Sequence, residues 1–145
     1  MRVQRYSDIH FLDLVRIVEK FHKEYLSDRF TPCEPDVIVD TIKEHCENTF
    51  LLISQDEKCV GVLAGVKIQS KFNGEIFFQE IIWYVEKPFG RYGFMLIREV
   101  EKFLKSTGVS TMIMSVLERS KSDKIKRIYS KLGYKLEETH FMRTL

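Results

Sequence analysis

The stretch EIIWYVEKPFGRYGFMLIREVEKFLKSTG, residues 80–108, decides the fold, because it predicts a strand that leads through a glycine-bearing loop into a helix. The apolar run Ile81–Val85 is strand-like, and Pro88, Gly90 and Gly93 interrupt it before apolar residues recur with helical spacing. The first N–H groups of a helix lack internal partners and carry the positive end of its dipole. The stretch therefore predicts a site for an anion, most simply a phosphate.

Composition limits the classes of protein to which the chain can belong. A length of 145 residues with 44% hydrophobic content predicts one domain, 1–145, with a single core. The 23 Lys and Arg against 21 Asp and Glu leave a net charge of +2, which excludes the strong basic field of a dedicated nucleic-acid binder. No stretch is apolar enough for a signal sequence or a membrane span. We therefore expect a soluble, cytoplasmic protein with neither nucleic acid nor membrane as its partner.

The cysteines and histidines show no metal-binding or disulfide pattern. The chain has three cysteines, an odd number, and no two of them have Cys-x-x-Cys spacing. The four histidines are scattered without the spacing of ligands. We therefore predict reduced thiols and no metal site.

The N-terminal half predicts two helices followed by antiparallel strands. The expected elements are a strand at 2–6, a helix capped by Ser7 or Asp8 and running to about Tyr25, a loop at 26–35, a helix at 36–46, and strands at 50–53, 60–68 and 75–85. Short turns connect these three strands, so the pattern predicts an antiparallel meander.

The C-terminal half predicts a parallel crossover. A helix from Phe94 ends at Gly108, and the strand expected at 111–116 should lie parallel to the strand before the helix. A short helix then runs from Ser122 or Asp123 to Gly133, and residues 134–145 supply one or two final strands. The predicted class is α+β with a mixed sheet.

Two segments of this chain resemble the GCN5-related N-acetyltransferases. WYVEKPFGRYGFMLIREVEKFLKSTG, residues 83–108, is similar to the family's acetyl-CoA segment, and IYSKLGYKLEE, residues 128–138, is similar to its C-terminal Tyr-Glu-Lys-Leu-Gly-Phe/Tyr segment. The order of elements matches along nearly the whole chain. The resemblance implies a three-layer fold, with a mixed, mostly antiparallel sheet of six to seven strands that is splayed between the fourth and fifth and flanked by about four helices. It also implies direct transfer of an acetyl group from acetyl-CoA to a primary amine.

The family's loop pattern, Gln/Arg-x-x-Gly-x-Gly/Ala, fits this chain in two registers. If Gly93 is the first glycine, Gly90 replaces the Gln or Arg and Met95 the second small residue. If helix length is matched instead, Gly93 is the second glycine and Arg91 replaces the first. The second register is preferred, because it also aligns the helix's paired apolar residues and its stop at Gly108.

The resemblance implies a set of residues that bind acetyl-CoA. Main-chain groups of Trp83, Tyr84 and Val85 would contact the pantetheine arm, which Ser122 would also reach. The pyrophosphate would lie against residues Gly90, Arg91, Tyr92, Gly93, Phe94 and Met95, with Arg91 as a charged donor. From the residues alone, the loop could also be an ordinary turn, Ser122 a helix cap, and Trp83–Val85 core.

Two residues are candidates for catalysis. Tyr129 occupies the position of the family's tyrosine that protonates the coenzyme A thiolate, and it also contacts the cofactor there; the alternative is a packed core tyrosine. Glu80 is an acid in an apolar strand, and burial would raise its pKa toward that of a useful base. On an exposed face, Glu80 would only be solvated.

The acceptor and any macromolecular partner are less defined by the sequence. Tyr25, Phe30 and Glu80 are expected to bind the amine, which is either a small molecule or a protein amine. The alternative is a catalytically silent acyl-CoA-binding or regulatory module that recognises a macromolecule.

Residues 139–145 could pair across a two-fold axis in a homodimer. The basic cluster Lys121, Lys124, Lys126, Arg127 and Lys131 could attract a phosphate or an acidic partner, or be a solvated helix face.

Overall fold

A single mixed sheet forms the centre of the molecule. The computed structural model describes residues 1–27, 34–117 and 122–138. Within these residues five strands lie in the order β1-β2-β3-β4-β5. Their bounds are Arg2–Arg5 (β1), Thr49–Ile53 (β2), Cys59–Gln69 (β3), Ile76–Val85 (β4) and Thr111–Ile113 (β5). Neighbouring strands are antiparallel except β4 and β5, which are parallel. The predicted mixed, mostly antiparallel sheet is confirmed, with five described strands where six to seven were expected.

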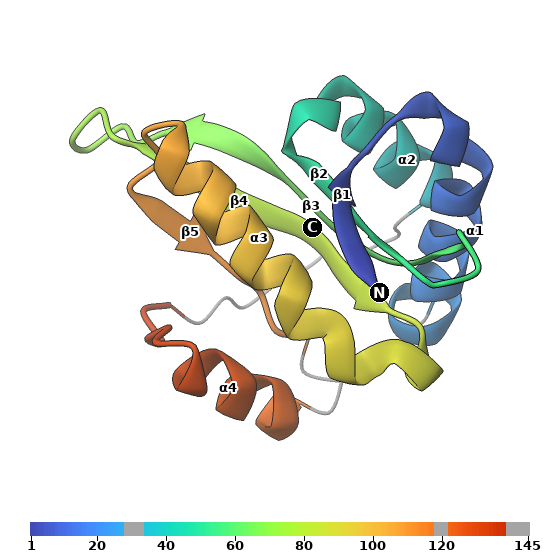
Figure 1. Ribbon diagram of the computed structural model, residues 1–145. Helices are drawn as coiled ribbons and strands as arrows, with labels where there is room; N and C mark the ends of the chain where they lie inside the picture. The colour runs from blue at the N-terminus through green and yellow to red at the C-terminus, as the bar shows by residue number, and fades with distance from the viewer. Residues whose placement is uncertain (28–33, 118–121, 139–145) are drawn as a thin grey trace.

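Helices cover both faces of the sheet, as predicted. Their bounds are Phe11–Phe21 (α1), Pro35–Glu44 (α2), Gly93–Ser106 (α3) and Ser122–Lys131 (α4). Figure 1 shows α3 lying across one face with α4 below it, whereas α1 and α2 cover the opposite face. Separate apolar clusters fill the two interfaces, one with α1 and α2 and the other with α3 and Tyr129 of α4. The fold therefore has three layers.

The first predicted helix is helical along its whole length but changes type. A 3-10 turn at Asp8–His10 precedes α1, and a π-helical turn at His22–Leu26 follows it. Ser7 occupies the cap position with an extended backbone, yet its side chain makes no capping hydrogen bond. Apolar residues recur along this helix because one of its faces packs against the sheet, where Leu14, Ile17 and Val18 are fully buried.

The C-terminal strands differ most from the prediction. The strand expected at 111–116 ends at Ile113. Residues 134–138, expected to begin a strand, form none, because the chain leaves the left-handed turn at Gly133 (φ 91°) without joining a neighbouring strand. The predicted dimer strand 139–145 lies outside the described residues. Nor does any helix in the described ranges have the length and apolarity that crossing a bilayer requires.

A bulge in β4 divides it into two registers. Ala64 pairs with Ile82 and Gly65 with Glu80, so Ile81 is an extra residue in β4. Gly65 makes this possible, because a Cβ there would lie 2.3 Å from the Gln79 carbonyl oxygen and 2.4 Å from Cζ of Phe78. The bulge therefore depends on the absence of a side chain at residue 65.

Replacing Gly65 with alanine should destabilise the fold. The added Cβ would force apart β3 and β4 at the bulge, and overpacking of this kind costs about 1–3 kcal/mol. Urea unfolding measures the change in the free energy of unfolding. Gly90→Ala is the control, because a Cβ there would meet nothing within 4 Å. Equal stability of the two variants would contradict the steric account.

Candidate functional site

The parallel strands β4 and β5 separate after three paired residues. Phe77, Phe78 and Gln79 pair with Thr111–Ile113, whereas β4 continues to Val85 without β5 beside it. Sequence reasoning expected this split between the fourth and fifth strands. Beyond Gln79, β4 therefore has one main-chain edge that no described strand covers.

The pairing of β4 with β3 shows which main-chain groups face the split. Glu86 donates its N–H to the carbonyl of Val60 at 2.9 Å. In an antiparallel pair such bonds alternate, so the groups of Tyr84 also face β3, and those of Trp83 and Val85 face the split. The main-chain groups of Trp83 and Val85 therefore face the side on which an extended ligand was expected. Those of Tyr84 do not, because its carbonyl oxygen points toward Gly61.

Glu80 lies where the two strands part. Its carboxylate accepts the main-chain N–H of Ser115 at 3.1 Å, and the main-chain N–H of Trp83 also donates to it. Burial raises the pKa of Glu80 to about 7, and these donated hydrogen bonds oppose part of that rise. Glu80 as a whole is half-buried. Both its charged and neutral forms are accessible near neutral pH.

Tyr129 reaches the same point from α4. Its hydroxyl donates to the carbonyl oxygen of Ser115 at 3.1 Å, and its ring lies 5.5 Å from that of Trp83. Burial raises the pKa of Tyr129, and the charge of Glu80 acts in the same direction, so the phenol keeps its proton. The predicted base and the predicted acid therefore bond to the same residue, Glu80 to the N–H of Ser115 and Tyr129 to its C=O.

Ser115 was not among the predicted site residues. It follows β5 by two positions and lies at the point where a continued strand would pair with β4. Its role depends on the end of β5 at Ile113, which the sequence did not predict.

Aromatic rings fill the space next to the split. The ring of Tyr129 lies between those of Trp83 and Tyr134, at 5.5 Å from each. The Tyr134 hydroxyl donates to Glu101 at 2.8 Å. The indole Nε1–H of Trp83 is buried and has no hydrogen-bond partner in the described residues.

The predicted glycine loop is helical. Residues Lys87–Tyr92 form a 3-10 helix that continues directly into α3. Phe89 donates its N–H to Glu86, and Gly93 donates its N–H to Gly90, so these donors are already used. The prediction of a glycine-bearing loop was wrong for these residues, because Pro88 stands at the start of a helical turn, where its fixed φ is favourable.

The residues expected around a pyrophosphate are not gathered in one place. Arg91, Tyr92 and Met95 line a hollow of about 440 Å³ shared with Met1 and with residues 54–56. Gly90 and Phe94 are exposed. Gly93 is buried against Trp83, where a Cβ would lie 3.2 Å from Cζ2 of the indole. Ser122 is the first residue of α4.

Of the expected acceptor residues, Tyr25 lies on the other face of the sheet. Tyr25 packs on Phe21 and Tyr84, with ring centroids 5.8 and 6.3 Å away. The Tyr84 hydroxyl donates to Glu24 at 3.0 Å. These described contacts do not include Glu80, and Phe30 lies outside the described residues.

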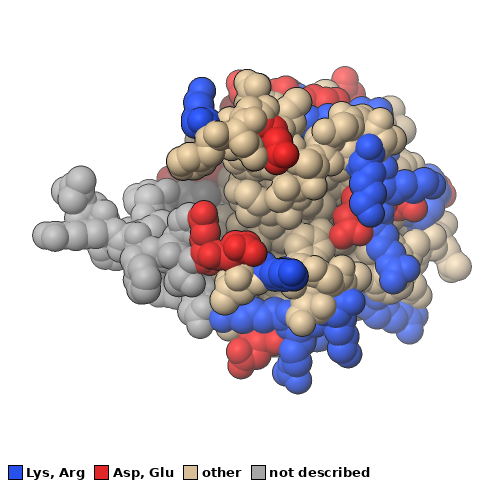
Figure 2. All heavy atoms as spheres, turned by 90° about the vertical axis from the view of Figure 1, so that its left-hand side faces the viewer, with Lys and Arg blue, Asp and Glu red and all other residues tan. Residues whose placement is uncertain are grey.

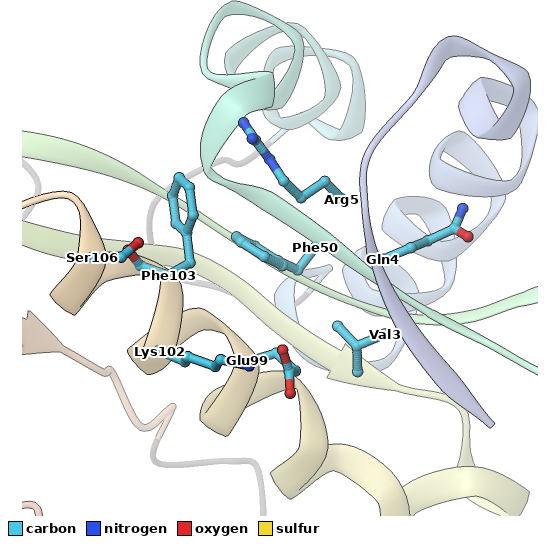
Figure 3. Close-up of a pocket in the computed structure, with 8 residues that line it drawn as sticks. All are labelled: Val3, Gln4, Arg5, Phe50, Glu99, Lys102, Phe103 and Ser106. Carbon is cyan, nitrogen blue, oxygen red and sulfur yellow. The ribbon is translucent and has the colours of Figure 1, made fainter.

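A second hollow, of about 320 Å³, lies between β1 and α3. Figure 3 shows Phe50 and Phe103 facing each other between these elements, and their rings are 5.3 Å apart. The guanidinium of Arg5 lies over the Phe103 ring at 4.9 Å. None of the predicted site residues lines this hollow.

Basic residues gather on α4. Figure 2 shows Lys and Arg side chains along its lower edge, where α4 lies in Figure 1. Lys124, Lys126, Arg127 and Lys131 are exposed there, and Lys121 lies outside the described residues. In the part of the chain that the structure describes, no three His, Cys, Asp or Glu residues are grouped so that they could hold a metal ion.

Comparison with known proteins identifies the fold. No family model and no curated protein matches the sequence.

Solved acetyltransferase structures do match the structure over nearly its whole length. An acetyltransferase from Trypanosoma brucei has a TM-score of 0.72 and 16% identity, covering 99% of both chains. An aminoglycoside acetyltransferase from an uncultured soil metagenomic sample has a TM-score of 0.74 and 16% identity, covering 99% of this chain and 97% of that one. Glucosamine-6-phosphate N-acetyltransferase from Arabidopsis thaliana has a TM-score of 0.70 and 13% identity, with coverage of 99% and 97%. At these identities the likeness establishes the fold, which is the acetyltransferase fold that the sequence predicted.

The raised pKa of Glu80 should make stability depend on pH. The folded protein holds this proton up to about pH 7, whereas the unfolded chain releases it near its usual value of 4.5. The free energy of unfolding should therefore fall as pH rises between these values, by up to about 3 kcal/mol for such a shift. Glu80→Gln should remove this dependence, so that the variant exceeds the wild type in stability at pH 8 but not at pH 4.

Urea unfolding at the two pH values measures this difference. Glu75→Gln, at an exposed position before β4, is the matched control and should follow the wild type. A Glu80→Gln variant whose stability changes with pH as much as that of the wild type would show that Glu80 ionises normally.

Proposed function

We propose that this protein is an N-acetyltransferase that moves the acetyl group of acetyl-CoA directly to a primary amine. The observation that carries the proposal is the convergence of Glu80 and Tyr129 on Ser115, where β4 and β5 part. Acetylation of an amine requires a base that removes the amine's proton and an acid that protonates the leaving thiolate. The split supplies one group of each kind.

The residues at the split fit the pantetheine arm of the cosubstrate. Beyond Gln79 no described strand pairs with β4 on the side of the split, so the carbonyl of Trp83 and the main-chain groups of Val85 can bond to an amide-containing chain as an added strand would, whereas the N–H of Trp83 already donates to Glu80. The unpartnered indole N–H of Trp83 lies beside them. For the nucleotide phosphates, Arg91 and the basic face of α4 supply positive charge. The N–H groups of Phe89 and Gly93 are already bonded within the helix and do not contribute in this conformation.

Acetyl-CoA would supply the activated thioester, and the chain's own residues would move the protons. Glu80, with its pKa near 7, accepts the proton of the incoming ammonium, directly or through water. The Tyr129 hydroxyl, which stays protonated, donates toward the position of the leaving sulfur. Each group gives up its bond to Ser115 in order to act. The main-chain N–H and C=O of Ser115 therefore hold the Glu80 and Tyr129 side chains in place before the substrates bind.

We infer that the acceptor is an amine on a small molecule or a protein, entering from the face covered by α1 and α2. Tyr25 packs there on the buried ring of Tyr84, and Glu24, which accepts from the Tyr84 hydroxyl, already pairs with the ammonium of Lys87 at 3.5 Å. Carboxylate and aromatic groups attract an ammonium ion. Structural neighbours that act on an aminoglycoside or on glucosamine-6-phosphate favour an amine of small size, although their likeness extends only to the fold.

A catalytically silent module that binds acyl-CoA or a macromolecule is the second candidate. The helical segment Lys87–Tyr92 favours it, because phosphate binding to main-chain donors would require that segment to change. A calorimetric titration with acetyl-CoA distinguishes the candidates. We expect saturable binding in the micromolar range, typical of enzymes for their substrates. A titration without heat at high micromolar ligand would remove the enzyme from consideration.

Replacing Tyr129 with phenylalanine should slow the chemical step. The change removes the proton donor and keeps the ring, so turnover should fall by about 10²-fold while the affinity for acetyl-CoA changes less than about threefold. Thiol release with a panel of small amines measures turnover, and calorimetry measures affinity.

Tyr134→Phe is the matched control, because it removes a hydroxyl from the neighbouring ring, and that hydroxyl bonds Glu101 outside the split. It should leave turnover near the wild-type value. Equal turnover of Tyr129→Phe and Tyr134→Phe would remove Tyr129 from the mechanism.

A further inference from the structure

The indole N–H of Trp83 is a buried donor without an acceptor. Its Nε1 atom is inaccessible to solvent and has no partner in the described residues. Leaving such a group unsatisfied costs about 1–3 kcal/mol, so native proteins rarely keep one without a reason. Phenylalanine would fill much of the same space without this cost. The donor therefore requires an explanation beyond packing.

Trp83 occupies a particular place in the fold. Its main-chain groups face the split, and its ring lies 5.5 Å from that of Tyr129. Gly93 also approaches the indole, because an added Cβ there would lie 3.2 Å from Cζ2 and 3.7 Å from Cε2, the carbon bonded to Nε1. The indole is thus close both to the ring of the proposed acid and to the first residue of α3.

We propose that the Trp83 indole N–H donates a hydrogen bond to an amide oxygen of the pantetheine arm of acetyl-CoA. This inference rests on the proposed function. The arm joins the sulfur to the phosphates, so in the proposed geometry it runs from Tyr129 toward the start of α3 and passes the indole edge. Amide oxygens are the acceptors that it offers along this path. An indole N–H can only donate, and therefore matches them.

The arm must displace groups that now close the split. The Trp83 Nε1 atom is covered, and Ser115 is bonded to both Glu80 and Tyr129. Binding therefore changes the surroundings of the indole, and tryptophan emission is sensitive to such changes. Trp83 is the single tryptophan among the 145 residues, so fluorescence reports this site alone when excitation avoids tyrosine.

The first experiment titrates the unaltered protein with coenzyme A and, separately, with adenosine 3′,5′-bisphosphate. Calorimetry runs beside the fluorescence as an independent measure of binding. We expect coenzyme A to change the emission with the same dissociation constant that calorimetry gives. The bisphosphate, which lacks the arm, should leave the emission near its starting value. A full response to the bisphosphate, or calorimetric binding of coenzyme A with constant emission, would overturn the assignment of Trp83 to the arm.

The second experiment compares Trp83→Phe with Tyr134→Phe by calorimetry. Losing one good hydrogen bond should weaken coenzyme A binding by about tenfold in Trp83→Phe, whereas Tyr134→Phe should bind as the wild type does. Equal affinity of Trp83→Phe and wild type would overturn the inference while leaving the proposed function intact. Absence of coenzyme A binding to the wild type would overturn both. If Trp83→Phe does not fold, the fluorescence titration of the wild type decides alone.

Discussion

The parting of β4 and β5 after Gln79 is the constraint on which the rest of the site depends. Where two strands separate, their main-chain groups lose partners, and buried groups of this kind must be satisfied in some other way. Here a carboxylate accepts the N–H of Ser115 and a phenol donates to its C=O. The two side chains suited to acid–base chemistry are therefore also the ones that replace the missing ladder bonds. The Glu80 carboxylate and the Tyr129 hydroxyl therefore stabilise the split and would also carry out the proposed proton transfers.

The bulge at Ile81 places Glu80 at this point. One extra residue in β4 shifts the register with β3 between Ala64 and Gly65. Bulges bend a strand and redirect its side chains, and they are common beside functional sites. Keeping a carboxyl group buried there costs stability above the pKa of Glu80, because its charged form is poorly solvated. A chain selected for stability alone would have an uncharged side chain in place of the Glu80 carboxyl group. Its presence is consistent with a chemical role, in line with the trade-off between stability and activity.

Sequence reasoning predicted the layers but not the details of the split. Periodicity located all four α-helices within a few residues, and the turn signals at Gly74 and Gly108 lie where the backbone has positive φ. Glu80 and Tyr129, chosen because an acid in an apolar strand and the C-terminal segment both carried recognisable signals, do bond to the same residue, Ser115. Ser115 was missed, since its role follows from where β5 stops. That end is set by tertiary packing, which local propensity does not encode.

The segment from Lys87 to Tyr92 shows where a local pattern misleads. Glycines after a strand suggested an open loop, yet neither Gly90 nor Gly93 has a positive φ, and Gly93 is needed for its close approach to Trp83. Because the 3-10 helix joins α3, the start of the combined helix moves back to Lys87. The residue before it, Glu86, is paired with Arg16 and Lys20. Its carboxylate makes no capping hydrogen bond to the helix. The N–H groups of Phe89 and Gly93 are bonded within this helix, so in the proposed complex the pantetheine arm along β4 and side-chain cations such as Arg91 would supply most of the affinity. The strand edge at Trp83 and Val85 would then contribute more to binding than the glycine segment from which the site was first predicted.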